Sequence, residues 1–271
     1  MKLSLITNNL ELATYANGLV DRLMIDLEYL GKKERQTGKD LFQSEHRIED
    51  ISILKPILSH MELMVRVNSI HDNTANEIDE VIQRGADIVM LPFFKTTQEV
   101  EYFIKCVGKR VKTSLLIETK EAVSILSELI TYKEIDEYHI GLNDLSISLG
   151  NNTIFDAVLD GTIENCIELL KTTNKPYGFG GVGSLSNKGL TINPLLCLSE
   201  QIRLGCSIGW LGRSFRNLIT DKDTLAKEIG LLRDAVSFLI NDDMEFNHII
   251  LRDMIAKKHR ELGFELKPYR I

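Results

Sequence analysis

Short apolar runs rich in large aliphatic and β-branched residues recur along the whole chain. Runs of this kind, bounded by polar or turn-forming residues, are typical of buried β-strands. Eight of them are present, at residues 3–7, 21–28, 61–68, 86–94, 112–119, 137–142, 177–182 and 206–212. Each is expected to form a strand.

The segments between these runs carry apolar residues at three- and four-residue spacing, which is the period of a helix with one buried face. Helices are expected at 74–85, 97–108, 120–131, 163–173 and 193–205. Strand and helix alternating eight times favours an α/β fold of the (β/α)8 TIM-barrel type, and 271 residues suit its usual size. A doubly wound open sheet has the same periodicity and stays an alternative.

Two parts of the chain do not fit the simple repeat. Residues 29–60 are too long and too charged for one connection, so an insertion made of a loop and a helix is expected over the barrel mouth. The tail at about 222–271 predicts additional C-terminal helices. We expect one domain over 1–271, and a homo-oligomer in which the extra helices contact a neighbouring subunit.

Charge and composition exclude several classes of partner. The formal net charge is -7 with a pI near 5.5, and the basic residues form no stripe that suits a nucleic acid. We find neither the apolar core of a secretory signal nor an apolar window long enough to span a membrane. The four cysteines lack metal-binding spacing. The expectation is a cytoplasmic protein that contacts no membrane.

Polar residues gather where the predicted strands end. In a TIM barrel this rim carries the active site. The fifth run ends in Glu118, and Asn143 and Asp144 follow the sixth, so the two carboxylates are expected to converge on a divalent cation such as Mg2+ or Mn2+. Arg66, at the end of the third run, has a guanidinium that suits a substrate carboxylate.

Each of these residues also has a structural interpretation. Asp144 is a suitable helix N-cap, Glu118 suits the start of a helix, and Arg66 is a suitable ion-pair partner for Glu28. Their shared placement at strand ends is what favours a functional site.

Other polar features give weaker signals. The glycine-rich segment 178–183 matches a dinucleotide fingerprint only formally, and is better interpreted as a strand end that lets a ligand approach the backbone. His139 lies within a predicted strand and is expected in the core, whereas His46 and His71 are weak candidates for proton transfer.

Several stretches together resemble one known family. The segments VDRLMIDLE, RVNSI, GADIVMLPFFKTTQEV, LLIETKEAV and IGLNDLSISLG occur in the order seen in the HpcH/HpaI aldolase and citrate lyase β-subunit family, within the phosphoenolpyruvate/pyruvate-binding barrel superfamily. The similarity runs from about residue 20 to 150.

This resemblance implies a lyase that depends on Mg2+ or Mn2+ and makes or breaks a carbon–carbon bond next to a 2-oxo acid or acyl group. Glu118 and Asp144 match the family's two metal-binding carboxylates, and Arg66 matches the arginine that holds the substrate and stabilises its enolate. Gly141 and Asn143 are expected to contact the substrate. Such chemistry needs no lysine Schiff base, because the cation acts as a Lewis acid.

The chain also departs from the family pattern. Members of the aldolase branch have a histidine after the glutamate of the second strand, where this chain has Tyr29 after Glu28. Glu28 and Tyr29 are therefore candidate catalytic residues beside Arg66, and the proton-transfer group stays open between Tyr29, a metal-bound water and a loop histidine. An HPxQ segment, found in members that use acyl-CoA, is missing.

The leading hypothesis is a class II, metal-dependent aldolase or lyase acting on a small 2-oxo acid such as pyruvate. An acyl-CoA or acyl-carrier lyase like the citrate lyase β-subunit is the first alternative. A catalytically silent protein that binds metal and carboxylate in a regulatory role is the second.

Overall fold

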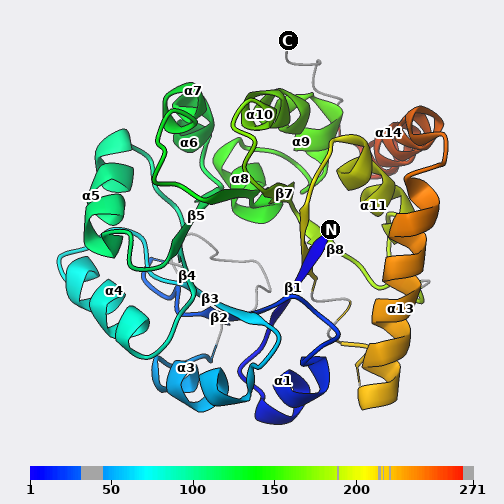
Figure 1. Cartoon of the computed structure of the whole chain (residues 1–271). Helices are drawn as coiled ribbons and strands as arrows, with labels where there is room; N and C mark the ends of the chain where they lie inside the picture. Colours follow the sequence, from blue (N-terminus) through cyan, green and yellow to red (C-terminus); the bar gives the residue numbers. More distant parts are fainter. Residues whose placement is uncertain (32–44, 188, 213–214, 216, 220, 265–271) are drawn as a thin grey trace.

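Parallel strands form the centre of the molecule, with helices around them (Figure 1). The computed structural model describes residues 1–31, 45–187, 189–212, 215, 217–219 and 221–264. Nine strands make one sheet in the order β7-β6-β5-β4-β3-β2-β1-β9-β8. They are β1 (Lys2–Ile6), β2 (Arg22–Asp26), β3 (Glu62–Arg66), β4 (Ile88–Leu91), β5 (Lys112–Ile117), β6 (Glu137–Ile140), β7 (Tyr177–Phe179), β8 (Gly181–Val182) and β9 (Ile208–Leu211).

The barrel closes where the predicted run 177–182 is divided at Gly180 into β7 and β8. Beside β7, the Ser207 amide donates to the Tyr177 carbonyl at 2.9 Å, and β8 pairs with β9. A Cβ on Gly178 would lie 2.1 Å from the Ile208 carbonyl oxygen, so only glycine permits this approach. The sheet is a nearly closed barrel, which confirms the TIM-barrel prediction and excludes the open sheet.

Helices follow the strands as the apolar spacing predicts. They are α1 (Leu10–Ala16), α3 (Glu49–Leu54), the 3-10 helix η1 (Lys55–Ile57), α4 (Thr74–Gln83), α5 (Thr97–Val107), α6 (Lys120–Ser124), α7 (Leu126–Leu129), α8 (Leu142–Ser148), α9 (Asp156–Leu159), α10 (Thr162–Lys171), α11 (Pro194–Arg203), α13 (Lys222–Leu239) and α14 (Met244–Glu261). Local signals set their ends: α5 begins with a Thr96–Glu99 capping box and ends at Gly108 in the left-handed conformation.

The strands bury both of their faces, which is why they read as continuous apolar runs. On β2, Leu23 and Ile25 belong to the main core, which also contains residues of the surrounding helices such as Ile78 and Val81. The residue between them, Met24, belongs to a second cluster with Met64, Ile88, Met90 and Leu116. This second cluster fills the barrel interior beneath the rim where the strands end.

A buried ionic cluster lies at the opposite, N-terminal end of the barrel interior. The Arg22 side chain, 1% exposed, donates from Nε to Glu62 at 2.9 Å and from Nη1 to Glu137 at 2.8 Å. Burial alone would lower the pKa of Arg22, but the two carboxylates raise it above its usual value. The guanidinium therefore stays charged and joins β2, β3 and β6.

Replacing Arg22 with lysine is expected to lower the free energy of unfolding by about 1.5–3 kcal/mol, because an ammonium cannot reproduce the forked contacts to buried carboxylates. Urea unfolding measures the change. The matched control is Arg84→Lys, which alters an exposed pair with Glu80 and is expected to cost less than about 1 kcal/mol. Equal effects at the two positions would contradict this assignment.

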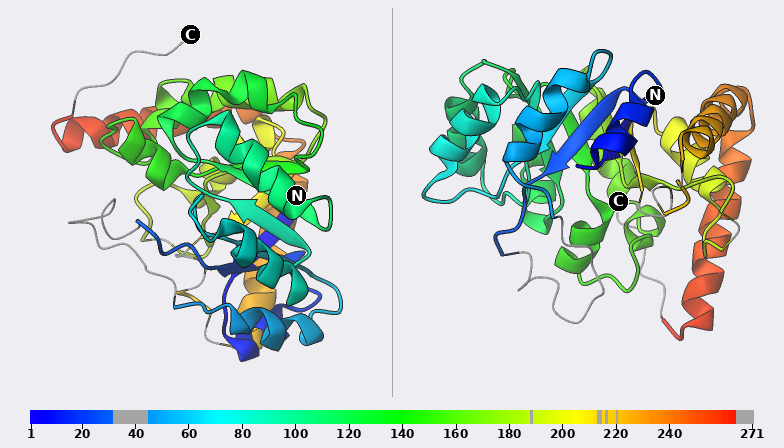
Figure 2. Two further views of the ribbon diagram at one scale, coloured as in Figure 1. Left: turned by 90° about the vertical axis from the view of Figure 1, so that its left-hand side faces the viewer. Right: turned by 90° about the horizontal axis from the view of Figure 1, so that it is seen from below.

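The additional C-terminal helices are present. The helix α14 packs against α11 and α9 and stands at the outer side of the molecule (Figure 2). His259 on α14 lies 2.8 Å from Asp156 at the start of α9, and both side chains are buried. The predicted insertion at 29–60 contains α3 and η1, while its residues 32–44 lie outside the described part. None of the described helices is long and apolar enough to span a membrane.

Candidate functional site

A cavity of about 520 Å³ opens at the C-terminal ends of the strands. Among the residues that line it are Asp26, Arg66, Glu118, Asn143 and Asp144. Four of the predicted strand ends therefore supply side chains to one space, because parallel strands of a barrel all end at the same rim. Gly141 also lines this cavity.

The two predicted metal-binding carboxylates reach the cavity from adjacent strands. Glu118 directly follows β5 and accepts a hydrogen bond from the Phe93 amide at 3.0 Å. Asp144 lies in the first turn of α8, whose N-cap is Gly141, so Asp144 does not serve as the N-cap residue. Both side chains are thus presented to the same cavity from short, ordered connections.

Gly141 leaves room for the Glu118 carboxylate. A Cβ at position 141 would lie 2.9 Å from Glu118 Oε2 and 3.1 Å from its Cβ. Since Oε2 is the end of a flexible side chain, the protein can accommodate an alanine there only by moving the carboxylate. Gly141 therefore fixes where Glu118 points, while its predicted contact with substrate stays a prediction.

Gly141→Ala is expected to weaken Mg2+ binding by about 10- to 100-fold, the usual effect of disturbing a ligand's support. The fold should stay intact, with little change in the unfolding midpoint. Isothermal titration calorimetry gives the affinity, with Gly230→Ala as the control, because nothing lies within 4 Å of a Cβ at position 230. Unchanged Mg2+ affinity in Gly141→Ala would show that the Glu118 carboxylate is not a ligand.

Arg66 is held by two acids at the end of β2. Its Nε and Nη2 donate to the two Asp26 oxygens at 2.8 and 2.7 Å, and its Nη1 lies 3.3 Å from Glu28 Oε2. Asp26 thus takes two of the five guanidinium N–H groups, and donors on Nη1 and Nη2 remain for a ligand. The predicted ion pair with Glu28 is present, together with the stronger Asp26 contact.

The electrostatics of the site favour a cation. Burial alone would lower the pKa of Arg66, but Asp26, Glu28 and Glu118 raise it above its usual value, so Arg66 stays charged. Together with Asp144, the site then contains four carboxylates, on Asp26, Glu28, Glu118 and Asp144, and the one guanidinium of Arg66. Its formal charge is therefore -3. Such a site, built from carboxylate oxygens, fits a hard divalent cation.

Within the described residues no group of three or more His, Cys, Asp or Glu side chains gathers in metal-binding geometry. Glu118 and Asp144 supply two carboxylates, and a catalytic cation needs open positions for substrate and water. The arrangement therefore fits an open catalytic site better than a closed structural one.

The other predicted catalytic residues are not part of the lining of this cavity, and Tyr29 and His46 line a separate pocket. The Glu28 side chain is 1% exposed and faces Arg66. Tyr29 is 68% exposed, and its backbone amide donates to Asn68 Oδ1 at 3.0 Å. His46 accepts a hydrogen bond from the Asp26 amide through Nδ1, at 2.9 Å. A catalytic role for Tyr29 stays a prediction.

His139 is buried as predicted, but it also lines the cavity. Its ring stacks on Trp210 of β9 with centroids 4.0 Å apart, and its Nε2 lies 2.9 Å from the Gly180 carbonyl oxygen. Burial lowers the pKa of His139 to about 3, so the ring is neutral at physiological pH. This pairing could not be predicted from the sequence, because β6 and β9 are far apart in the chain.

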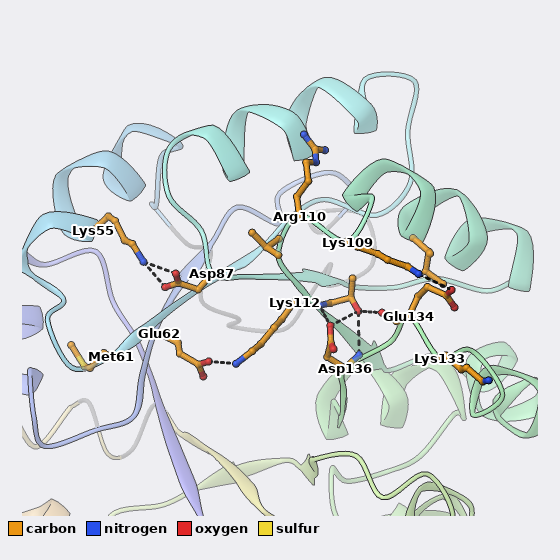
Figure 3. A pocket seen from close by; sticks show the side chains of 13 residues that line it. Lys55, Met61, Glu62, Asp87, Lys109, Arg110, Lys112, Lys133, Glu134 and Asp136 are labelled. Carbon is orange, nitrogen blue, oxygen red and sulfur yellow. Dashed lines mark hydrogen bonds and ion pairs between the residues drawn. The ribbon is translucent and has the colours of Figure 1, made fainter.

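A second pocket, of about 830 Å³, opens at the N-terminal ends of the strands (Figure 3). Several of its charged side chains pair with one another: Lys55 lies 2.6 Å from Asp87, and Lys112 pairs with Glu62. Charges satisfied in this way stabilise the fold, and TIM-barrel chemistry takes place at the other rim. We therefore assign the functional site to the cavity of Glu118 and Asp144.

Comparisons with known proteins show the family of this chain. The sequence model described as HpcH/HpaI aldolase/citrate lyase matches residues 7–158, more than half of the chain, and this range includes Arg66, Glu118 and Asp144. A search of curated proteins found no match for this sequence.

Solved structures show the same fold at low sequence identity. An HpcH/HpaI aldolase/citrate lyase family protein from Burkholderia cenocepacia J2315 is 12% identical with a TM-score of 0.61, covering 88% of this chain and 94% of its own. An HpcH/HpaI aldolase from Desulfitobacterium hafniense DCB-2 is 13% identical, with a TM-score of 0.60 and 86% and 93% coverage. The citrate lyase beta subunit from M. tuberculosis, complexed with oxaloacetate and magnesium, is 15% identical, with a TM-score of 0.57 and 84% and 96% coverage.

The family match includes all four charged residues of the cavity lining, Asp26, Arg66, Glu118 and Asp144, and the fold is the one these relatives have. This lyase-type enzyme belongs to the HpcH/HpaI aldolase/citrate lyase family.

Proposed function

We propose that this chain is a divalent-metal-dependent aldolase that cleaves or forms a carbon–carbon bond next to a small 2-oxo acid such as pyruvate. The observation that carries the proposal is the meeting of Glu118, Asp144 and Arg66 in one cavity at the C-terminal rim. The magnesium and oxaloacetate bound in the M. tuberculosis citrate lyase beta subunit support both the metal and the class of ligand.

Each residue has a distinct task in this proposal. Glu118 and Asp144 hold Mg2+, or Mn2+ in its place, through carboxylate oxygens. The bound cation supplies Lewis-acid polarisation of the 2-oxo acid. Arg66, fixed by Asp26, directs its remaining N–H groups at the anionic oxygen that gains charge when a proton or an aldehyde leaves the neighbouring carbon.

Two side chains are candidates for the proton-transfer group, Tyr29 and His46. The neutral His139 has a pKa of about 3 and is a poor base at physiological pH. Tyr29 stays a candidate, although its side chain is largely exposed. His46 is a second candidate, because its hydrogen bond to the Asp26 amide holds it beside the Arg66–Asp26 pair. Single Tyr29→Phe and His46→Gln variants separate the two.

Metal dependence is the decisive test of the proposed function. Wild-type protein with Mg2+ is expected to exchange the methyl protons of pyruvate with solvent deuterium and to decarboxylate oxaloacetate. Removal of the cation with EDTA should return both rates to those of a protein-free solution with EDTA, and added Mg2+ or Mn2+ should restore them above the rates that the free cation gives without protein. Proton NMR and absorbance follow the two reactions.

A protein that binds Mg2+ and pyruvate but accelerates neither reaction would be the silent binder instead. A third result, cleavage of an acyl-CoA with no reaction on free pyruvate, would favour the citrate lyase-like alternative. The absence of the HPxQ segment from the sequence makes us expect no such cleavage.

A further inference from the structure

The cavity has two chemically different sides. Its polar pole consists of Asp26, Arg66, Glu118 and Asp144. Its apolar pole consists of Leu142, Ile154, Phe155, Leu190, Ile192 and Trp210. The polar pole accounts for a 2-oxo acid and a cation, but it gives no reason for an apolar wall in the same space.

The two poles lie over different parts of the barrel. Asp26, Arg66 and Glu118 come from β2, β3 and the end of β5, whereas Trp210 comes from β9 and Ile192 from the connection between β8 and α11. In the strand order, β1 separates the two groups on one side and β6 with β7 on the other. Leu142, Ile154 and Phe155 come from the connection between β6 and β7, which also carries Asp144. The apolar pole therefore extends from beside Asp144 to β9, on the other side of the barrel mouth from Asp26 and Arg66.

The cavity is larger than the proposed 2-oxo acid. Pyruvate has six non-hydrogen atoms, which occupy at most roughly 180 Å³ if each fills as much space as a water molecule. The cavity measures about 520 Å³. Room for a second group therefore remains, and the side chains of the apolar pole border it.

The floor of the apolar pole is flat and uncharged. Trp210 stacks on His139 with an angle of 2° between the rings. Burial lowers the pKa of His139 to about 3, so no imidazolium charge lies beneath Trp210 at physiological pH. Leu142 and Ile192 are themselves buried, so this wall is built into the barrel rather than exposed by chance.

We propose that the partner of the 2-oxo acid is an uncharged aldehyde with an aliphatic or aromatic substituent, and that the apolar pole binds this substituent. The proposal rests on the proposed function, since the polar pole must hold the 2-oxo acid. Burial of each further methylene of the aldehyde is expected to strengthen binding about fourfold, until the cavity is full.

The reaction balances without an oxidant or a reductant. In the synthetic direction, C3 of pyruvate loses a proton and forms a bond with the aldehyde carbon. The π electrons of the aldehyde C=O move to its oxygen, which takes up a proton. The product is a 4-hydroxy-2-oxo acid with the apolar substituent at C4, and cleavage is the reverse.

Trp210 provides a binding signal that needs no turnover, because it is the one tryptophan of the chain. Its fluorescence is measured in Mg2+-loaded protein titrated with butanol, hexanol and octanol as unreactive probes. The dissociation constant should fall about fourfold per methylene. In parallel, kcat/KM for condensation with pyruvate is measured for three apolar aldehydes, butanal, hexanal and benzaldehyde. The values are compared with those for the polar aldehydes succinic semialdehyde and glycolaldehyde.

A charge-bearing variant sharpens the test. Ile154 is 42% exposed, so Ile154→Arg keeps its charged end in solvent and is expected to fold. It should shift the preference for hexanal over succinic semialdehyde by about tenfold toward the charged aldehyde. The control is Ile53→Arg on α3, where the isoleucine is 55% exposed and lies away from the cavity lining.

The apolar pole is supported if alcohol affinity and kcat/KM for the aldehydes both rise with chain length, and if the preference shifts in Ile154→Arg but not in Ile53→Arg. The apolar-pole proposal is overturned if neither alcohol affinity nor kcat/KM changes with chain length, or if the wild-type protein prefers succinic semialdehyde. Either result overturns it even where pyruvate exchange proceeds. If fluorescence shows the chain-length dependence but pyruvate neither exchanges nor condenses, the proposed function fails and the apolar binding site stands.

Discussion

Replacing Glu118 with glutamine is expected to lower kcat/KM for oxaloacetate decarboxylation by about 10²- to 10³-fold, comparable to the loss of one strong electrostatic contact in an active site. Glutamine keeps the shape of the side chain and its acceptor for the Phe93 amide, so the fold should be retained. The same loss is expected for Asp144→Asn. The cause is the removal of one negative charge from a site that must bind a divalent cation.

Two matched substitutions control for the loss of charge elsewhere. Glu128 and Asp72 are exposed and lie outside the lining of the cavity, so Glu128→Gln and Asp72→Asn should leave activity and Mg2+ affinity at wild-type values. Calorimetry should show one Mg2+ site per wild-type chain and none in either cavity variant. Full activity in both Glu118→Gln and Asp144→Asn would place the metal elsewhere.

Arg66→Met is expected to abolish activity and to lower the free energy of unfolding by about 3–5 kcal/mol. The large effect on stability arises because Asp26 and Glu28 are buried and would lose the guanidinium that neutralises them. Arg66→Lys keeps the charge but cannot bind both Asp26 oxygens and a substrate carboxylate, so its activity should also fall. Urea unfolding and kcat/KM are measured on the same preparations.

A double variant separates the structural role of Arg66 from its chemical role. Adding Asp26→Asn to Arg66→Met removes one of the two unpaired acids and should recover part of the lost stability, with no recovery of activity. Restored turnover in the double variant would mean that Arg66 only neutralises Asp26. Wild-type activity in Arg66→Lys would contradict the proposed role of the guanidinium N–H groups that the Asp26 contact leaves for the substrate.

The barrel and the main residues of its rim were predictable because both follow from local pattern and topology. Glu118 and Asp144 each directly follow an apolar run, and in a barrel of parallel strands such positions lie at one end. Their entry into the same cavity required only the correct fold class. The extent of each element was less predictable, as the division of the run 177–182 at Gly180 shows.

Contacts between side chains on different strands could not be predicted from the sequence. The pairing of Arg66 with Asp26 depends on the register that sets these residues directly opposite each other on β3 and β2. The sequence instead favoured Glu28 as the partner, which is present at the longer distance of 3.3 Å. The stacking of His139 on Trp210 likewise depends on barrel closure.

The apolar pole was missed for a related reason. Ile154 and Ile192 lie in connections, where an apolar residue carries no periodic signal. Only the folded chain shows that these connections meet over the same cavity as Trp210. Substrate preference is therefore encoded mainly outside the strands that place the catalytic groups.

The most direct measurement of the central claim is a crystal structure of the protein grown with Mn2+ and pyruvate, with anomalous data collected at the manganese edge. We expect one manganese ion per chain, ligated by Glu118 and Asp144, with the pyruvate carboxylate or its carbonyl within reach of Arg66. Manganese bound at another place, or pyruvate bound away from Arg66, would contradict the assignment of this cavity as the active site.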